Sequence, residues 1–280
     1  MSGHRSYLRA ALGSAGGRAG AIAVGAILLF GIAAPVVLPD PAAQPDIVGG
    51  ALQPPSALAP FGTDDLSRDV LARVAAGARV SIAVAAIAVA LSATLGTLIG
   101  IVAGYAGGAV DAVLMRVVDG ALAVPRLFVL LLLLAAWERM PLAALILIIG
   151  VTGWFGTSRL VRAEVLRLRE ADFVRAAEAL GARPGRVMFR HLLPNTLGPL
   201  LVAATLAVGD VILLEAGLSF LGLGVRPPTP SWGGMIYDGR AVLTTAPWVS
   251  IFPGLAIIAT VLSVNLLAGG LRAALNPREA

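Results

Sequence analysis

The chain has 280 residues, of which 58% are hydrophobic and 13% are charged, with a formal net charge of +5. A soluble globular domain carries about 45–50% apolar and about 25% charged residues, so the composition excludes that class and indicates a membrane protein. All the basic side chains are arginines and cysteine is absent, which excludes the lysine of a Walker A phosphate loop, disulfides and thiolate metal sites.

Six apolar stretches approach the length of a spanning helix, which takes about 20 predominantly apolar residues. They are residues 19–38, 80–104, 113–137, 142–157, 197–223 and 248–270. The fourth is short. Apolar positions in the arginine-rich segment that follows it, residues 158–196, allow its helix to continue. The sequence therefore predicts an all-α integral membrane protein with six transmembrane helices, formed by one membrane domain (19–280) after an N-terminal tail (1–18).

The first stretch shares features with a signal peptide, because arginines precede an apolar run that ends at Ala33 and Ala34. Pro35 follows directly, however, the run is longer than a usual signal sequence, and five more stretches come later. We interpret it as an uncleaved first helix.

Arginine placement predicts the orientation, since cytoplasmic loops retain an excess of positive charge. The arginines concentrate in the N-terminal tail, in segment 158–196 and near the C-terminus. Both termini and segment 158–196 are therefore predicted to be cytoplasmic, and segments 39–79 and 224–247 to be external loops.

The two external loops differ in character. Segment 39–79 reads as a solvated loop with a short surface helix that begins at Thr63 or Asp64 as the N-cap. Segment 224–247 contains the proline-rich run Pro227–Trp232, which favours a stiff extended element with its tryptophan at the membrane interface.

Several ionisable residues fall within the predicted spans, among them Arg116, Asp119, Asp210 and Glu215, and each costs about 2.5 to 3.5 kcal/mol near the bilayer centre. Arg116 and Asp119 are three positions apart, so they lie on one helix face and can pair, or Arg116 can snorkel. Asp210 and Glu215 lie on roughly opposite sides of the fifth span. Either residue can line a translocation path, or it can form hydrogen bonds inside the bundle.

Small residues crowd the second span, as in Ser92–Gly96 and Gly96–Gly100. They allow close helix approach, which serves bundle packing or subunit pairing.

The arginine-rich segment carries an apolar stripe at helical spacing, formed by Phe173, Ala176, Ala177 and Leu180. Gly181 suits the left-handed residue that ends a helix, and Pro184 suits the first turn of another. The pattern predicts a helix, a tight turn and a second short helix that ends near Pro194. It fits an amphipathic hairpin on the membrane surface or an element that docks in a partner's groove.

The motif series resembles the permease subunits of bacterial binding-protein-dependent ABC importers, in their dipeptide, oligopeptide and nickel branch. Arg175-Ala176-Ala177, Gly181 and Leu193-Pro194 are similar to that family's Glu-Ala-Ala loop. The other matching stretches are Gly62–Asp69, Met115–Asp119 with Pro125, Phe189–Asn195, Leu214–Gly224, Pro227–Gly233, Pro253–Ala256 and Asn265–Leu267.

The resemblance implies a type I permease bundle in the bacterial inner membrane, with no catalytic or metal site. It implies as partners a second homologous permease, two ATPases that bind ATP and Mg, an external solute-binding protein and the lipid bilayer, but no nucleic acid. Coupling to the ATPases through loop 172–194 would involve Arg175, Ala176, Ala177, Glu178, Ala179, Leu180 and Gly181. Arg175 replaces the family's glutamate, for which Glu178 could serve.

Two alternatives belong to other classes. Asp119, Asp210 and Glu215 could be cation sites of a secondary transporter, although the chain shows no internal repeat. An intramembrane hydrolase lacks support, because His191 has no suitably spaced serine or acid partner. The resemblance leaves the solute open among dipeptides, oligopeptides and nickel complexes.

Overall fold

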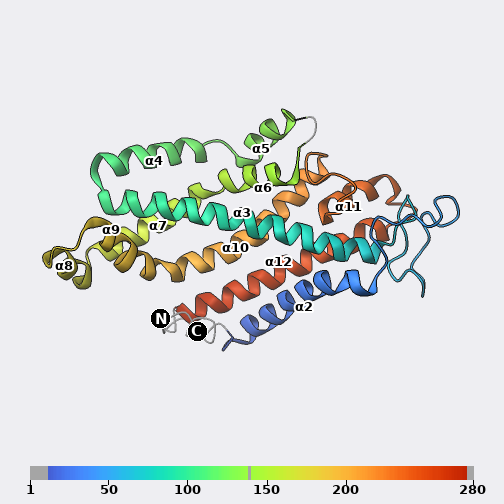
Figure 1. The fold of residues 1–280 in the computed structure, drawn as a ribbon, viewed down its shortest axis with the longest axis horizontal. Coiled ribbons are helices and arrows are strands. Elements are labelled where there is room, and N and C mark those ends of the chain that lie inside the picture. Colours follow the sequence, from blue (N-terminus) through green and yellow to red (C-terminus); the bar gives the residue numbers. More distant parts are fainter. Residues whose placement is uncertain (1–11, 138–139, 276–280) are drawn as a thin grey trace.

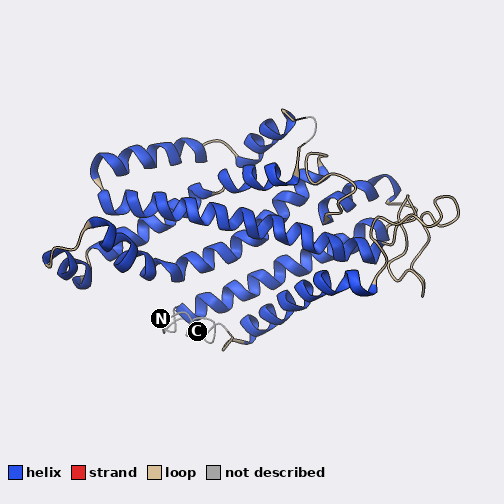
Figure 2. Cartoon of the chain, viewed as in Figure 1, coloured by secondary structure: helices blue, strands red, loops and turns tan. Residues whose placement is uncertain are grey.

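The computed structural model describes residues 12–137 and 140–275, so residues 1–11 of the predicted tail lie outside the described residues. Within these ranges the chain consists of helices joined by loops, without a β-strand (Figure 2). The helices are α2 (Ala15–Val37), α3 (Val70–Ala106), α4 (Gly108–Leu122), α5 (Arg126–Ala135), α6 (Leu142–Val151), α7 (Trp154–Arg169), α8 (Asp172–Ala179), α9 (Pro184–Arg186), α10 (Leu193–Phe220), α11 (Trp232–Gly239) and α12 (Trp248–Leu275).

The predicted spans correspond to five helices that are long and apolar enough to cross a membrane, plus one bent pair that makes a sixth. The second span begins at Val70 rather than Val80. The fourth continues into the arginine-rich segment as predicted, because α6 and α7 together form one span from Leu142 to Arg169. The all-helical membrane architecture is confirmed.

The third span is not the single helix that its hydropathy predicted. It consists of α4 and α5, which meet at an angle of 76°. Pro125 stands at the break as the N-cap of α5. A proline lacks the amide hydrogen that a continuous helix needs and disfavours the helical conformation of the residue before it, so the helix breaks here.

Helix α3 runs through the centre of the bundle and packs against α7, α10, α6 and α2, while α12 packs against α2 and α10 (Figure 1). Glycines at one-turn spacing bring α3 close to α7. If these glycines carried a Cβ atom, it would lie too close to α7. The distance would be 2.6 Å from Gly96 to Thr157 Cβ, 2.5 Å from Gly100 to the backbone carbonyl oxygen of Ser158, and 2.8 Å from Gly104 to Val165 Cγ1. These small residues therefore serve packing within this chain.

The predicted surface helix at Thr63 or Asp64 is absent, and the first cap is five positions further on. Asp69 accepts a hydrogen bond from the amide of Ala72 at 2.7 Å and starts α3. Asp64 is instead 2% exposed, because its carboxylate binds Arg68 Nε at 2.7 Å and Arg73 Nη1 at 2.6 Å. This buried ion cluster ties the loop before α3 to the helix itself.

The Trp232 side chain is buried in the protein, rather than exposed as expected for a tryptophan at a membrane interface. The residue starts α11, is 1% exposed and donates a hydrogen bond from Nε1 to the carbonyl of Val74 at 3.0 Å. Segment 224–247 is thus not purely an extended loop, because it contains a helix whose first residue belongs to the core.

The start of α2, the end of α12 and helix α8 lie toward the same end of the bundle, at the left of Figure 1. Segment 38–69 and α11 lie toward the opposite end. This arrangement agrees with the predicted grouping of both termini with the arginine-rich segment. Which end faces the cytoplasm stays a prediction.

Candidate functional site

The α8 segment, residues 172–181, projects from one end of the bundle and ends as its sequence predicts. Gly181 has a φ of +79°, in the left-handed region that glycine enters without penalty. The amide of Ala182 binds the carbonyl of Ala177 at 3.0 Å, and the amide of Gly181 binds that of Glu178 at 2.9 Å. These bonds satisfy carbonyls at the end of the helix.

One buried side chain anchors α8 to the bundle. Val174 is 0% exposed and belongs to an apolar cluster with Ile101 of α3, Val161 of α7 and Val187 after the turn. Complete burial of a valine side chain stabilises its position by about 1.5 kcal/mol or more. The helix is therefore held against three separate parts of the fold through its one inward position.

The predicted apolar stripe faces away from this anchor. Leu180 is 89% exposed and Phe173 is 42% exposed. Ala176 and Ala179 are also exposed, and Ala177 is half-buried. Exposed apolar side chains gathered on one short helix are typical of interaction surfaces.

The second half of the predicted hairpin differs from expectation, because no helix ends near Pro194. Pro184 starts the short helix α9 as predicted, and a π-helical turn, Val187–Leu192, leads directly into α10. Pro194 is the second residue of α10, directly after the π-helical turn, and it has no amide hydrogen to donate back to that turn. The turn at Gly181 is thus continuous, through helical backbone, with the fifth span.

Polar contacts fix both ends of α8. The Tyr105 hydroxyl at the end of α3 donates to Glu178 Oε1 at 3.0 Å. Arg175 pairs with Glu170, and both side chains are mostly exposed. Exposed pairs of this kind contribute about 0–1 kcal/mol. Arg175, which stands where the resemblance implies a glutamate, therefore bonds to a neighbouring residue of its own segment.

Of the two alternatives for Arg116 and Asp119, the structure does not show the direct pair. Asp119 instead pairs with Arg159 of α7. Nearby, the guanidinium of Arg162 binds both carboxylate oxygens of Asp111. The two pairs join α4 to α7, since each arginine reaches the neighbouring helix from its position on α7.

Glu215 and Asp210 have contrasting surroundings. Glu215 is 0% exposed and accepts hydrogen bonds from the hydroxyls of Ser81 at 3.2 Å, Ser219 at 2.6 Å and Ser231 at 3.0 Å. It thus links α3, α10 and the start of α11, as in the prediction of bonding within the bundle. Asp210 is exposed on this chain.

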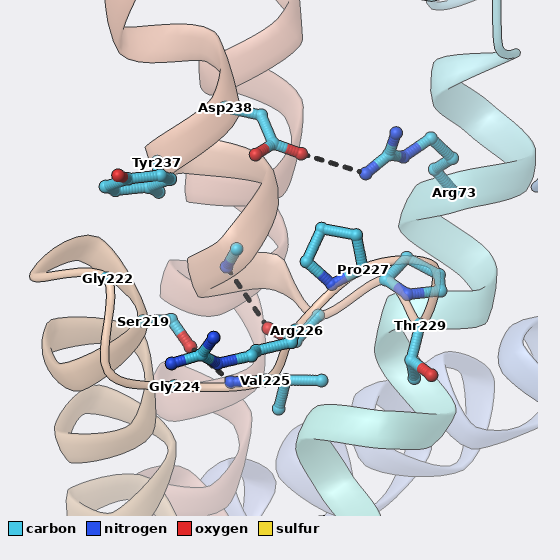
Figure 3. Close-up of a pocket in the computed structure, with 13 residues that line it drawn as sticks. Arg73, Ser219, Gly222, Gly224, Val225, Arg226, Pro227, Thr229, Tyr237 and Asp238 are labelled. Carbon is cyan, nitrogen blue, oxygen red and sulfur yellow. Dashed lines mark hydrogen bonds and ion pairs between the residues drawn. The ribbon is translucent and has the colours of Figure 1, made fainter. Parts of the chain in front are cut away.

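A small cavity is lined by Ser219 and Ser231 of the Glu215 cluster, by Tyr237 and Asp238 of α11 and by Arg73 of α3 (Figure 3). Arg73 and Asp238 face each other across it, with Nη2 and Oδ2 3.2 Å apart. Burial raises the pKa of Asp238, although Arg73 and Arg68 partly offset it. The cavity volume is about 90 Å³, well below the roughly 300–1,000 Å³ of small-molecule sites. The Arg73–Asp238 pair therefore serves to join α3 to α11.

Sequence reasoning missed the residues that hold α8 in place. Tyr105 lies 73 positions from its partner Glu178 and has no pattern that would identify it. Val174 was available in the sequence, because it is an apolar residue that lies beside the stripe positions Phe173 and Ala177.

The sequence comparisons agree with this architecture. Residues 96–280 match the family described as "Binding-protein-dependent transport system inner membrane component". This match covers the α8 segment and every helix after it. The family description implies a solute-binding protein and an ATPase as partners.

Several curated proteins are similar over most of their length. The dipeptide transport system permease protein DppC of Alkalihalophilus pseudofirmus is 41% identical over 92% of this chain and 84% of its own. A putative peptide permease protein of Brucella suis is 46% identical, over 78% and 72%. The oligopeptide transport system permease protein OppC of Bacillus subtilis is 41% identical, over 81% and 74%. The chain therefore belongs to the family of binding-protein-dependent, multi-pass inner-membrane permeases, which lack an ATPase site of their own.

Proposed function

We propose that the chain is one of two homologous permease subunits in an ATP-driven importer of peptides, and that its α8 segment docks in a groove of an ATPase subunit. Residues 172–194 would lie in the cytoplasm with both termini, and each ATPase would bind ATP and Mg. The observation that carries the docking proposal is the exposed apolar surface of Phe173, Ala176 and Leu180 on an anchored helix.

The attachments of α8 suit it to transmit force in two directions. Val174 and the Tyr105–Glu178 bond connect it to α3, and the helical backbone after Pro184 connects it to α10. A displacement of α8 by the ATPases would therefore move two spans directly. In an alternating-access cycle, nucleotide binding would draw the two α8 segments together and open the path outward, and hydrolysis would reset it.

Peptides are the proposed substrate because the relatives described above carry the names of dipeptide, oligopeptide and peptide permeases. The solute-binding protein would deliver the peptide at the end formed by segment 38–69 and α11. The chain itself needs no catalytic group, since the chemical step would occur in the ATPases.

The test is to express the chain with the second permease, the two ATPases and the binding protein, and to purify the complex through this chain. We expect the ATPases to co-purify and proteoliposomes to accumulate peptide only with ATP, Mg and the binding protein. Leu180→Glu places a charge on the docking surface, so it should reduce ATPase retention by about tenfold or more.

Leu58→Glu provides the matched control, because Leu58 is 97% exposed but lies in the loop at the opposite end of the bundle. It should leave ATPase retention unchanged. Retention that is equally strong in both variants would refute docking through α8. Peptide accumulation by this chain alone, without ATP, would instead favour a secondary transporter.

A further inference from the structure

A pocket of about 620 Å³ is lined by three spans, α7, α10 and α12, near the end of the bundle that carries α8 (Figure 1). Its volume falls in the range of small-molecule sites. Helix α10 packs against both α7 and α12, so it forms the floor of this α10 pocket. The floor residues follow helical spacing and share one face of the helix: Asn195, Pro199, Val202, Ala203 and Leu206.

The lining of the α10 pocket changes from polar to apolar along the spans. Near the α8 end it includes Asn195 in the first turn of α10 and Arg167 in the last turn of α7. Further along the same helices it consists of Leu206 and Leu160. The floor from Asn195 to Leu206 covers about 16 Å, roughly half of the 30 Å hydrocarbon core. The polarity of the pocket therefore changes over the depth of one leaflet and in the same direction as in the bilayer.

Helix α12 contributes a guanidinium to the polar part. Arg272 and Leu275 are three positions apart and share a helix face. Leu275 packs onto α10 so closely that a Cβ on Gly198 would lie 2.7 Å from Leu275 Cδ2, which fixes this face of α12 against the pocket.

Arg272 is also the guanidinium of the pocket that has no partner. Within residues 12–137 and 140–275 it forms no ion pair and no side-chain hydrogen bond, whereas Arg167 pairs with Glu164 at 2.9 Å. Two arginines against one carboxylate give the polar end of the pocket an excess of positive charge. Its chemistry thus suits an anionic group.

We infer that the α10 pocket binds an anionic phospholipid of the leaflet on the α8 side, with its phosphate at Arg272 and one acyl chain along Leu160, Val202 and Leu206. A basic pocket between spanning helices is suited to such headgroups. A peptide fits the apolar part poorly, because its backbone amides would lie there without hydrogen-bond partners. The inference needs only the membrane location of the chain and is independent of the proposed function.

The experiment titrates the full chain, purified in detergent with the subunits that stay bound to it and stripped of lipid. Native mass spectrometry measures the affinities for dioleoylphosphatidylglycerol, which is anionic, and for dioleoylphosphatidylcholine, which is zwitterionic. We expect phosphatidylglycerol to bind more tightly. Arg272→Gln should weaken its binding about tenfold, the scale of one charge-assisted hydrogen bond, and bring it close to that of phosphatidylcholine.

Matched variants separate the headgroup from the chain and from folding. Arg18→Gln removes another exposed arginine at the same end of the bundle that does not line the pocket, so both affinities should stay within about twofold. Arg272→Lys keeps the charge and should keep the preference. Ala203→Phe fills the apolar part and should weaken both lipids about tenfold. The melting temperature of each lipid-free variant checks folding, and dihexanoylphosphatidylglycerol tests the chain contribution on the wild type, where it should bind at least about tenfold more weakly than the dioleoyl lipid.

Several results would overturn the inference. Equal wild-type affinities for the two dioleoyl lipids, or no change in Arg272→Gln, would remove the role of the guanidinium. Displacement of phosphatidylglycerol by glycerol 3-phosphate at an equal concentration would show a site for free phosphate. Displacement by trialanine would assign the pocket to a transported peptide. Failure of ATP-dependent peptide uptake would overturn the proposed function and leave the lipid site standing.

Discussion

The hydroxyl of Tyr105 donates a 3.0 Å hydrogen bond to Oε1 of Glu178, and so joins the last turn of α3 to α8. This bond, together with buried Val174, sets how α8 stands on the bundle. The exposed stripe of α8 remains free for a partner because these contacts use its other positions.

Tyr105→Phe removes this bond but keeps the ring and its packing. An exposed neutral–charged hydrogen bond of this kind contributes about 1 kcal/mol, so we expect ATP-coupled uptake to fall by roughly twofold to tenfold per ATP hydrolysed. The ratio of transport to ATPase activity in proteoliposomes measures this. Glu178→Gln retains an acceptor oxygen and should have a smaller effect, and a larger loss with glutamine would contradict the hydrogen-bond explanation.

Gly181→Ala should weaken the turn through the backbone alone. A Cβ at Gly181 meets no atom within 4 Å, but the φ of +79° costs a non-glycine residue roughly 1–2 kcal/mol. We expect reduced ATPase retention and reduced uptake. Gly269→Ala in α12 is the matched control, since its Cβ also meets nothing within 4 Å and no positive φ is involved. Equal behaviour of the two variants would argue against a strained turn.

Substitutions at Glu215 separate its charge from its hydrogen bonds. In Glu215→Gln the amide oxygen can still accept from Ser219 and Ser231, and the amide nitrogen can donate to the Ser81 hydroxyl. The thermal stability of this variant should therefore be close to that of the wild type. Glu215→Leu leaves three buried hydroxyls without their acceptor, at a cost on the order of 3 kcal/mol, which lowers the melting temperature by roughly 10 °C. If glutamine were as damaging as leucine, the carboxylate charge itself would be required, as in an ion-coupled transporter.

Adjacent aspartates offer a sharp comparison in the loop before α3. Asp64→Asn weakens the acceptor shared by two buried arginines, which should destabilise the region by about 3–5 kcal/mol and expose segment 38–69 to limited proteolysis. The Asp65 side chain is 51% exposed, with its oxygen 3.8 Å from Arg68, so Asp65→Asn should change protease resistance very little. Equal cleavage of both variants would show that the buried cluster does not hold the loop.

Local patterns in the sequence predicted much of the fold. Hydropathy located the spans, and Gly181 and Pro184 located the turn and the next helix start, because these features depend on neighbouring residues alone. Charge spacing could not choose between pairing and snorkelling at Arg116 and Asp119, since a shared helix face only permits a pair and the partner of Asp119, Arg159, belongs to another helix. The same limit explains Trp232, whose burial depends on α3 passing beside it.

By itself, the sequence determined that this protein is a helical membrane protein with an apolar stripe and a glycine turn in its arginine-rich segment, because hydrophobic length, helical period and backbone freedom are properties of contiguous residues. The permease function was indicated by the resemblance of its motifs to a known family. Only the tertiary structure decided that Val174 is the anchor and the stripe is free, that Glu215 is bound by three serines and that Asp119 pairs with Arg159 of α7. These contacts link residues far apart in the chain. They depend on where helices cross, which no local period specifies.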